Sequence, residues 1–186
     1  PFVGTGENRY IGGVAEKHGV ALDIIEAKRR TYEIYLAMVP ERLKAIPGAV
    51  KVVHACRAAG WLTAVASSAD LVKVHANLLA IGLPGKAWSA VVTAEDVAER
   101  KPAPDIFRKA ARRMGVPPEQ CLVVEDAPSG IQAARAAGMP CVAVATSFKP
   151  EQIAGADRVV DSMAGLLRIM PRAARTVTPG RRLRQA

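Results

Sequence analysis

Residues 122–130 read Leu-Val-Val-Glu-Asp-Ala-Pro-Ser-Gly, and this stretch decides the fold. Its three leading apolar residues, two of them β-branched, predict a short buried strand that ends at two carboxylates. The next four residues turn the chain, and residues 131–137 are typical of a helix. In open α/β sheets, ligands bind beyond the carboxyl ends of the strands. Glu125 and Asp126 therefore stand where acids can hold a hard cation such as Mg²⁺, although acids there can also simply cap the next helix.

The rest of the chain from residue 43 alternates strands with helices of about ten residues, a pattern that indicates parallel pairing with right-handed crossovers. We therefore predict an α/β fold, a doubly wound parallel (Rossmann-like) sheet. The expected strands cover residues 61–66, 90–93, 122–124, 141–144 and 159–160, and the expected helices cover residues 49–59, 70–81, 105–114, 131–137 and 162–169.

Two helices precede this alternating part, with no strand between them. The first is expected over residues 7–18, and the second over residues 23–38, where Asp23 and Glu26 have the spacing of a capping box. The Pro47-Gly48 pair marks the change of pattern. We predict a small, partial helical cap lobe at 1–42 and an α/β core at 43–170.

The bulk composition excludes several classes of protein. Half of the 186 residues are hydrophobic, yet no run approaches the roughly 18 apolar residues of a membrane span. The three cysteines are scattered and favour buried thiols over disulfides or zinc. The net charge of +9 falls to +4 for residues 1–170, because residues 171–186 hold five arginines and no acid. This end is predicted to be a basic disordered tail, and its lack of aromatic residues argues against nucleic acid as a partner.

Two further features fall at predicted strand ends, on the same rim of the sheet as Glu125 and Asp126. Ser67 follows the strand at 61–66, and Lys101 lies beyond the strand at 90–93 in a Lys-Pro-Ala-Pro segment that we expect to be a rigid extended loop. A hydroxyl donor, an ammonium group and a carboxylate pair with Mg²⁺ together suit a phosphoryl group. Ser67 alone could be a helix cap and Lys101 alone a solvated charge, but their joint placement favours a phosphate site.

The segments that carry these residues resemble the second, third and fourth motifs of the haloacid dehalogenase-like hydrolases, and most of all those of the β-phosphoglucomutase-like phosphatases. The three segments are Val-Ala-Ser-Ser at 65–68, Lys-Pro-Ala-Pro-Asp-Ile-Phe at 101–107 and Val-Glu-Asp-Ala-Pro-Ser-Gly-Ile at 124–131. They match in order and spacing, and the resemblance extends from Pro1 to about Ile169.

The resemblance implies a phosphatase or phosphomutase that acts on a small phosphorylated metabolite. It implies that Ser67 binds the transferring phosphoryl group and that Lys101 stabilises it. Glu125 and Asp126 are implied to hold Mg²⁺. The substrate-binding residues implied are Thr5, Glu7 and Ser68.

The leading segment is also similar to the cap lobe of the haloacid dehalogenase domain in the suppressor-of-quenching proteins of chloroplasts. That similarity implies a chloroplast location and, in a longer protein, fusion to further domains. We find no thioredoxin-like or β-propeller sequence in these residues, and the arginine-rich end does not resemble a continuation into them.

The sequence departs from the family at its first motif, Asp-x-Asp-Gly-Thr. The aspartates are at 23, 70, 96, 105, 126, 157 and 161, and no two of them are two positions apart. By the resemblance, that motif would precede Pro1 and would supply the nucleophile, the proton-transfer group and one metal ligand. We therefore expect a fragment without phosphatase activity of its own. Its first strand would lie between those at 61–66 and 122–124, so its absence should leave a slot or force those two strands to pair.

Three other functions remain open from the sequence. The chain could be a non-catalytic haloacid dehalogenase-like domain with a binding or regulatory role. A phospho-accepting receiver domain also uses acids at strand ends, but the leading helical lobe and the Lys101 loop argue against it. Binding of nucleic acid through the arginine-rich tail is the least favoured.

Overall fold

The computed structural model describes residues 7–174, and the side chains of residues 8–170. Helices and strands alternate as the sequence predicts, and among these residues no helix is long and apolar enough to cross a membrane. The helices are α1 (Glu7–Lys17), α2 (Ile24–Arg42), α3 (Ala49–Ala58), α4 (Leu71–Ala80), α5 (Asp105–Met114), α6 (Pro128–Ala137) and α7 (Met163–Ala174). The strands are β1 (Ala64–Ala66), β2 (Ala90–Val92), β3 (Val123–Glu125), β4 (Cys141–Val144) and β5 (Arg158–Val160). Single 3₁₀ turns, including η2 (Ala94–Asp96), join them.

The five strands form two separate parallel sheets, one of order β1-β2 and one of order β3-β4-β5. No described strand pairs with the second edge of β1 or of β3. The burial pattern agrees with this division, because β4 is buried at all four positions, whereas Val124 in the middle of β3 is 38% exposed. Of the two arrangements expected from the sequence, the structure therefore has the slot.

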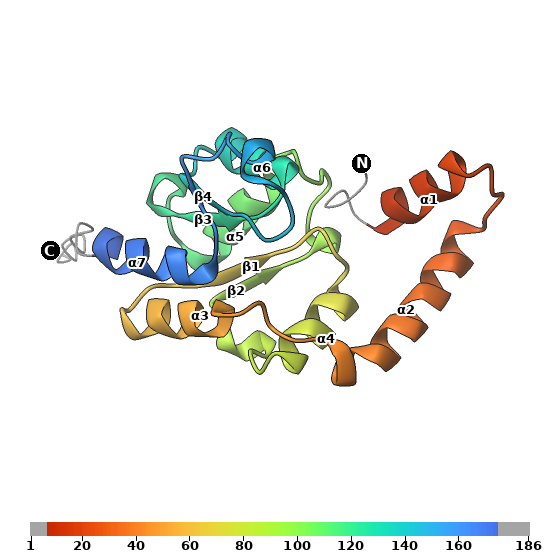
Figure 1. The fold of residues 1–186 in the computed structure, drawn as a ribbon, viewed down its shortest axis with the longest axis horizontal. Helices are drawn as coiled ribbons and strands as arrows, with labels where there is room; N and C mark the ends of the chain where they lie inside the picture. Colours follow the sequence, from red (N-terminus) through yellow and green to blue (C-terminus); the bar gives the residue numbers. More distant parts are fainter. Residues whose placement is uncertain (1–6, 175–186) are drawn as a thin grey trace, which may run out of the picture.

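We call the β1-β2 sheet and the β3-β4-β5 sheet the two half-sheets. Helices on both faces hold them together. On one face, α5 packs against β1 and β2 and also against α6, which covers β3 and β4. On the other face, α3 of the first half packs against α7 of the second (Figure 1). Their apolar side chains form two clusters, in which the fully buried members include Val92, Ile106 and Ile153 on the α5 side and Leu166 on the α7 side.

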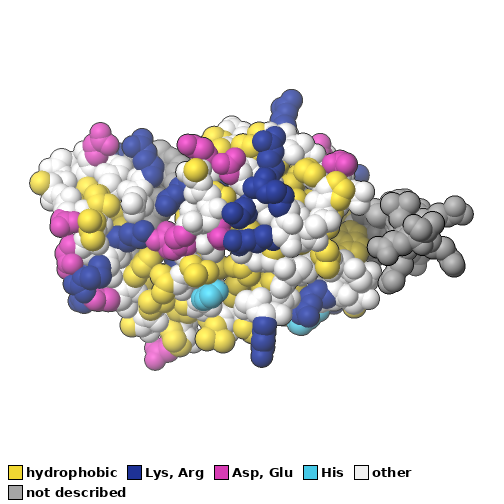
Figure 2. Space-filling view, turned by 180° about the vertical axis from the view of Figure 1, so that it is seen from behind, with side chains coloured by type: hydrophobic (Ala, Val, Ile, Leu, Met, Phe, Trp, Pro, Cys, Tyr) yellow, Lys and Arg dark blue, Asp and Glu magenta, His cyan; other side chains and the backbone are white. Residues whose placement is uncertain are grey.

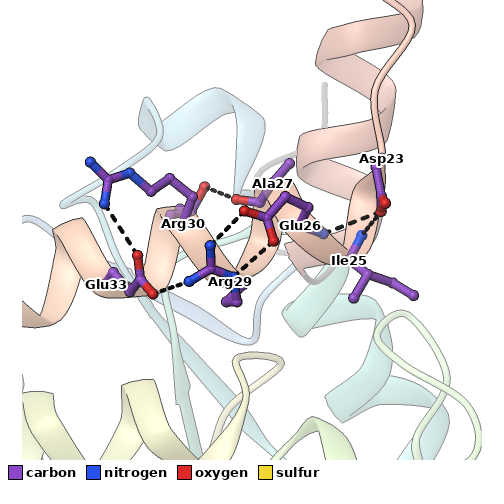
Figure 3. Close-up of polar contacts among 8 residues, drawn as sticks. Asp23, Ile25, Glu26, Ala27, Arg29, Arg30 and Glu33 are labelled. Atoms are coloured by element: carbon purple, nitrogen blue, oxygen red, sulfur yellow. Dashed lines mark hydrogen bonds and ion pairs between the residues drawn. The ribbon is translucent and has the colours of Figure 1, made fainter.

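Helices α1 and α2 form the helical lobe, residues 7–42, which extends away from the sheets as an arm (Figure 1). The predicted start of α2 is confirmed, because the Asp23 carboxylate accepts hydrogen bonds from the Ile25 and Glu26 N–H groups (Figure 3). On the exposed side of α2, Arg29 pairs with Glu26 and Glu33. The space-filling view shows charged side chains on the lobe interspersed with apolar ones (Figure 2).

The structure corrects several expected boundaries. β1 begins at Ala64 rather than at residue 61. The Thr63 N–H donates to the side-chain hydroxyl of Ser89 and not to a backbone carbonyl of a neighbouring strand. The Lys101–Pro104 segment is a turn, because the Ala103 N–H bonds back to the Arg100 carbonyl. Helix α7 continues to Ala174, into the expected tail, and residues 175–186 lie outside the described part of the chain.

Candidate active site

The side chains of Lys101 and Glu125 form an ion pair at the carboxyl ends of β1 and β3, and each is only 9% exposed. The Lys101 ammonium also donates to the Ala66 carbonyl at the end of β1, over 3.3 Å. It lies 4.7 Å from the centre of the Phe107 ring, in α5. Lys101 thus joins the rims of the two half-sheets, and this contact brings two predicted site residues together.

Both oxygens of the Glu125 carboxylate accept hydrogen bonds from the protein around them. One oxygen receives Lys101, and the other accepts the N–H groups of Asp126 and Ala127 at 3.0 and 3.1 Å. Gly130, in the first turn of α6, makes room for it, because a Cβ there would lie 2.0 Å from the Glu125 carboxyl carbon. Glu125 therefore fixes the turn after β3 and holds Lys101 in place.

Asp126 occupies the position next to this anchored carboxylate. Its Oδ2 accepts a hydrogen bond from the Ser147 hydroxyl, which lies in the loop after β4. The sequence prediction missed Ser147. The signal was present, since Thr146 and Ser147 follow the predicted strand at 141–144 as Ser67 and Ser68 follow theirs.

Ser67 stands directly after β1, one residue beyond the carbonyl that Lys101 contacts. Its N–H donates to the Val92 carbonyl of β2, which fixes the turn, and its Oγ accepts the Ala69 N–H at 3.1 Å. Because the oxygen acts as the acceptor, the hydroxyl hydrogen can be donated to an anion. The Ser68 hydroxyl is buried without a hydrogen-bond partner among the described residues, as is that of Ser129 in α6.

The structure does not describe the side chains of the other two predicted substrate-binding residues. Thr5 lies outside the described residues. Glu7 is the first residue of α1, and its side chain is also outside the described part.

The rim offers the type of ligand that Mg²⁺ prefers, but few such ligands. Asp126 offers a carboxylate oxygen at the rim, beside the Ser147 hydroxyl, and hard cations prefer such oxygen ligands. Both oxygens of Glu125 already accept hydrogen bonds, whereas Asp126 accepts one at Oδ2 only. Asp126 is therefore the better placed of the two acids to bind a cation. Among residues with described side chains, no group of three or more acidic, histidine or cysteine residues is arranged to hold a metal.

A thiol nucleophile is not offered at this rim. Cys141 begins β4 and is buried, and burial raises the pKa of its thiol to about 12, with a smaller contribution from the Glu125 carboxylate. The thiol is therefore neutral at physiological pH, and thiolate is the reactive form.

Comparison with known proteins places this geometry in context. A model of the haloacid dehalogenase-like hydrolases matches residues 3–138. The chain is 48% identical over 151 residues to "Protein SUPPRESSOR OF QUENCHING 1, chloroplastic" of Arabidopsis thaliana. That match covers 80% of this chain but only 14% of the relative's length.

Two further relatives match over most of their own length. The fructose-1-phosphate phosphatase YqaB of Escherichia coli is 38% identical over 138 residues, which is 73% of this chain and 71% of that protein. The crystal structure of CbbY from Rhodobacter sphaeroides in complex with phosphate superposes with a TM-score of 0.78 at 33% identity, over 87% of this chain and 75% of that one.

Proposed function

The chain belongs to the haloacid dehalogenase-like hydrolases, and from this membership we propose that it is the phosphate-positioning part of a Mg²⁺-dependent phosphatase or phosphomutase for a small phosphorylated metabolite. The observation that carries the proposal is the buried Lys101 ammonium, held by Glu125 and the Ala66 carbonyl beside Ser67. An ammonium held in a fixed position, against the residue that precedes a serine hydroxyl donor, suits the oxygens of a transferring phosphoryl group.

Each rim residue then has a role that follows from its contacts. Ser67 donates its hydroxyl hydrogen to a phosphoryl oxygen, while Ala69 orients that hydroxyl. Lys101 faces the same oxygens as a compact positive charge. Glu125 positions Lys101 and the turn after β3, and Asp126, oriented by Ser147, holds Mg²⁺. When bound, Mg²⁺ supplies further neutralisation of phosphoryl charge.

The covalent step needs a carboxylate that these 186 residues do not hold in an Asp-x-Asp arrangement. In the proposed reaction, one carboxylate oxygen attacks phosphorus and the bond from phosphorus to the ester oxygen breaks. A second carboxyl group gives the departing oxygen its proton, and water then releases phosphate from the aspartyl-phosphate. We propose that this pair of acids sits on a strand between β1 and β3, where two strand edges have no partner among the described residues.

The remaining proposals rest on resemblance. The helical lobe is proposed to be part of a substrate-selecting cap, and the α/β core to begin near residue 43. A chloroplast location and fusion to further domains are proposed from the Arabidopsis relative, whose name says chloroplastic and whose length is far greater than the matched part.

A second candidate is a non-catalytic domain with a binding or regulatory role. The pairing of Lys101 with Glu125 favours it, because that pairing already neutralises the ammonium without any ligand. A chain of this kind would bind an anion weakly and turn nothing over, whatever is added to it.

The test is to join a strand that carries Asp-x-Asp-Gly-Thr, taken from CbbY, ahead of Pro1 and to assay Mg²⁺-dependent hydrolysis of p-nitrophenyl phosphate and sugar phosphates. The proposal predicts turnover by the extended chain, lost in Lys101→Ala and Asp126→Asn. If the extended chain folds but releases no phosphate, the result supports the second candidate, a non-catalytic domain.

A further inference from the structure

The helical lobe meets the core through a polar contact between α2 and α4. Lys28 of α2 pairs with Asp70, the residue before α4, with side chains 24% and 11% exposed. Seven residues further along each helix, the Tyr35 hydroxyl donates to the Asn77 side-chain oxygen at 2.9 Å. Lys73 also lies 4.8 Å from the centre of the Tyr35 ring. The equal spacing means that the two helices run side by side in a fixed register.

Asp70 is the buried member of this contact and is 8% exposed as a residue. Although it precedes α4, its carboxylate caps none of the helix N–H groups. The Leu71 N–H is instead bound by Glu95, at 2.9 Å to the nearer carboxylate oxygen. Lys28 is therefore the partner that compensates a nearly buried charge, since an uncompensated buried carboxylate is costly.

The same short turn carries the phosphate-site serines. Ser67 and Ser68 precede Asp70 by three and two residues, and the Ala94 N–H donates to the Ala69 carbonyl at 3.1 Å. The core thus holds the turn through β2 and η2. Lys28, which belongs to the helical lobe, holds the other end of the turn at Asp70. The lobe and the turn are two parts of one contact network.

We propose that Lys28 is a positioning residue, through which docking of the helical lobe fixes the Ser67–Asp70 turn. Breaking the ion pair loosens both the lobe and the turn, and a ligand that orders the turn favours the docked lobe in equal measure. The consequence for phosphate binding rests on the proposed function, whereas the coupling itself does not.

The test is amide hydrogen exchange of the complete chain, read separately for residues 67–71, for α2 and for the α5–α6 core. Lys28→Met keeps the aliphatic stem and removes the charge. Exchange at residues 67–71 and in α2 should rise by about tenfold, with the α5–α6 core unchanged, as expected of a local opening. Asp70→Asn should do the same.

The matched control is Arg30→Met, also in α2, whose pair with Glu33 is 67% and 46% exposed and lies within the helix (Figure 3). It should leave exchange at residues 67–71 unaltered. The double variant Lys28→Met/Asp70→Asn should exchange no faster than either single variant, because the two residues act as one pair.

Unchanged exchange at residues 67–71 in Lys28→Met, or single effects that multiply in the double variant, overturns the proposal. Failure of the extended chain to hydrolyse phosphate esters would overturn the proposed function and leave the exchange result standing. The two proposals therefore fail separately.

Discussion

At the scale of single residues, the site depends on one carboxylate with three partners. Glu125 binds Lys101 and two backbone N–H groups, and Gly130 leaves it the space to do so. The sequence identified Glu125 and Asp126 as a pair, but not the different contacts that each makes. That difference follows from contacts with Lys101 and Ser147, which are 24 and 21 residues away from their acids.

Gly130→Ala tests the packing of this carboxylate. The added Cβ would overlap Glu125, so we expect a loss of about 1–3 kcal/mol in the free energy of unfolding, measured by urea titration. Gly155→Ala is the control, because its Cβ would meet only Ile131, at 3.8 Å, and should change stability by less than about 1 kcal/mol. Equal stability of the two variants would show that Glu125 does not occupy the described position.

Lys101→Met tests the ion pair that joins the half-sheets. The change leaves a 9% exposed carboxylate without its cation, and we expect a loss of about 3 kcal/mol of unfolding free energy in urea. Lys101→Met/Glu125→Gln should lose less than the single variant, since the buried charge is gone while an oxygen remains for the two N–H groups. Strictly additive losses would argue that the two side chains do not interact.

At the scale of elements, the caps and glycines made the helices predictable. Helix α5 runs from Asp105 to Met114 as expected and ends at Gly115, whose positive φ of 66° suits glycine. Strand ends were less predictable, because three-residue strands are fixed by their neighbours rather than by their own residues. The α2–α4 contact joins residues 42 positions apart, and no local pattern in the sequence reports such a distance.

The attachment of η2 to α5 gives a pH prediction. Arg113 pairs with Asp96 and, with the Thr93 N–H, lowers the pKa of that carboxyl below its ordinary value of 3.8. A depressed folded-state pKa contributes stability above the unfolded pKa, and this contribution is lost as the pH falls through the folded value.

Arg113→Met should therefore destabilise the chain by no more than about 1 kcal/mol at pH 6, because the pair is partly exposed. The difference from the unmodified chain should shrink as the pH falls below 3.8. Urea midpoints across this pH range measure it, with Arg112→Met of the same helix as the control. A constant difference down to acid pH would mean that Asp96 is not the partner that matters.

At the scale of the whole molecule, the strands form two separate sheets. The helices pack across this division, α5 against α6 and α3 against α7. The slot between β1 and β3 leaves two strand edges without a strand partner among the described residues, and open edges favour association with other chains. Apolar side chains are also exposed, with Ile25 at 82% and Leu79 at 70%. The sequence predicted the missing pairing from the family's strand order, but only the structure could decide between a slot and a closed sheet.

The divided sheet predicts marginal stability for the 186-residue chain alone. Its thermal unfolding should depend on protein concentration, because the free edges associate. Calorimetry at several concentrations is the measurement, and a cooperative melt whose midpoint is the same at all of them would contradict this expectation.

We propose that this chain assembles the phosphate-positioning side of a phosphoryl-transfer site without the acids that perform the covalent step. The most direct test is to incubate the purified 186-residue chain with p-nitrophenyl phosphate and Mg²⁺ and to follow release of p-nitrophenol. We predict no turnover above that of buffer. Mg²⁺-dependent turnover that Asp126→Asn abolishes would contradict the claim.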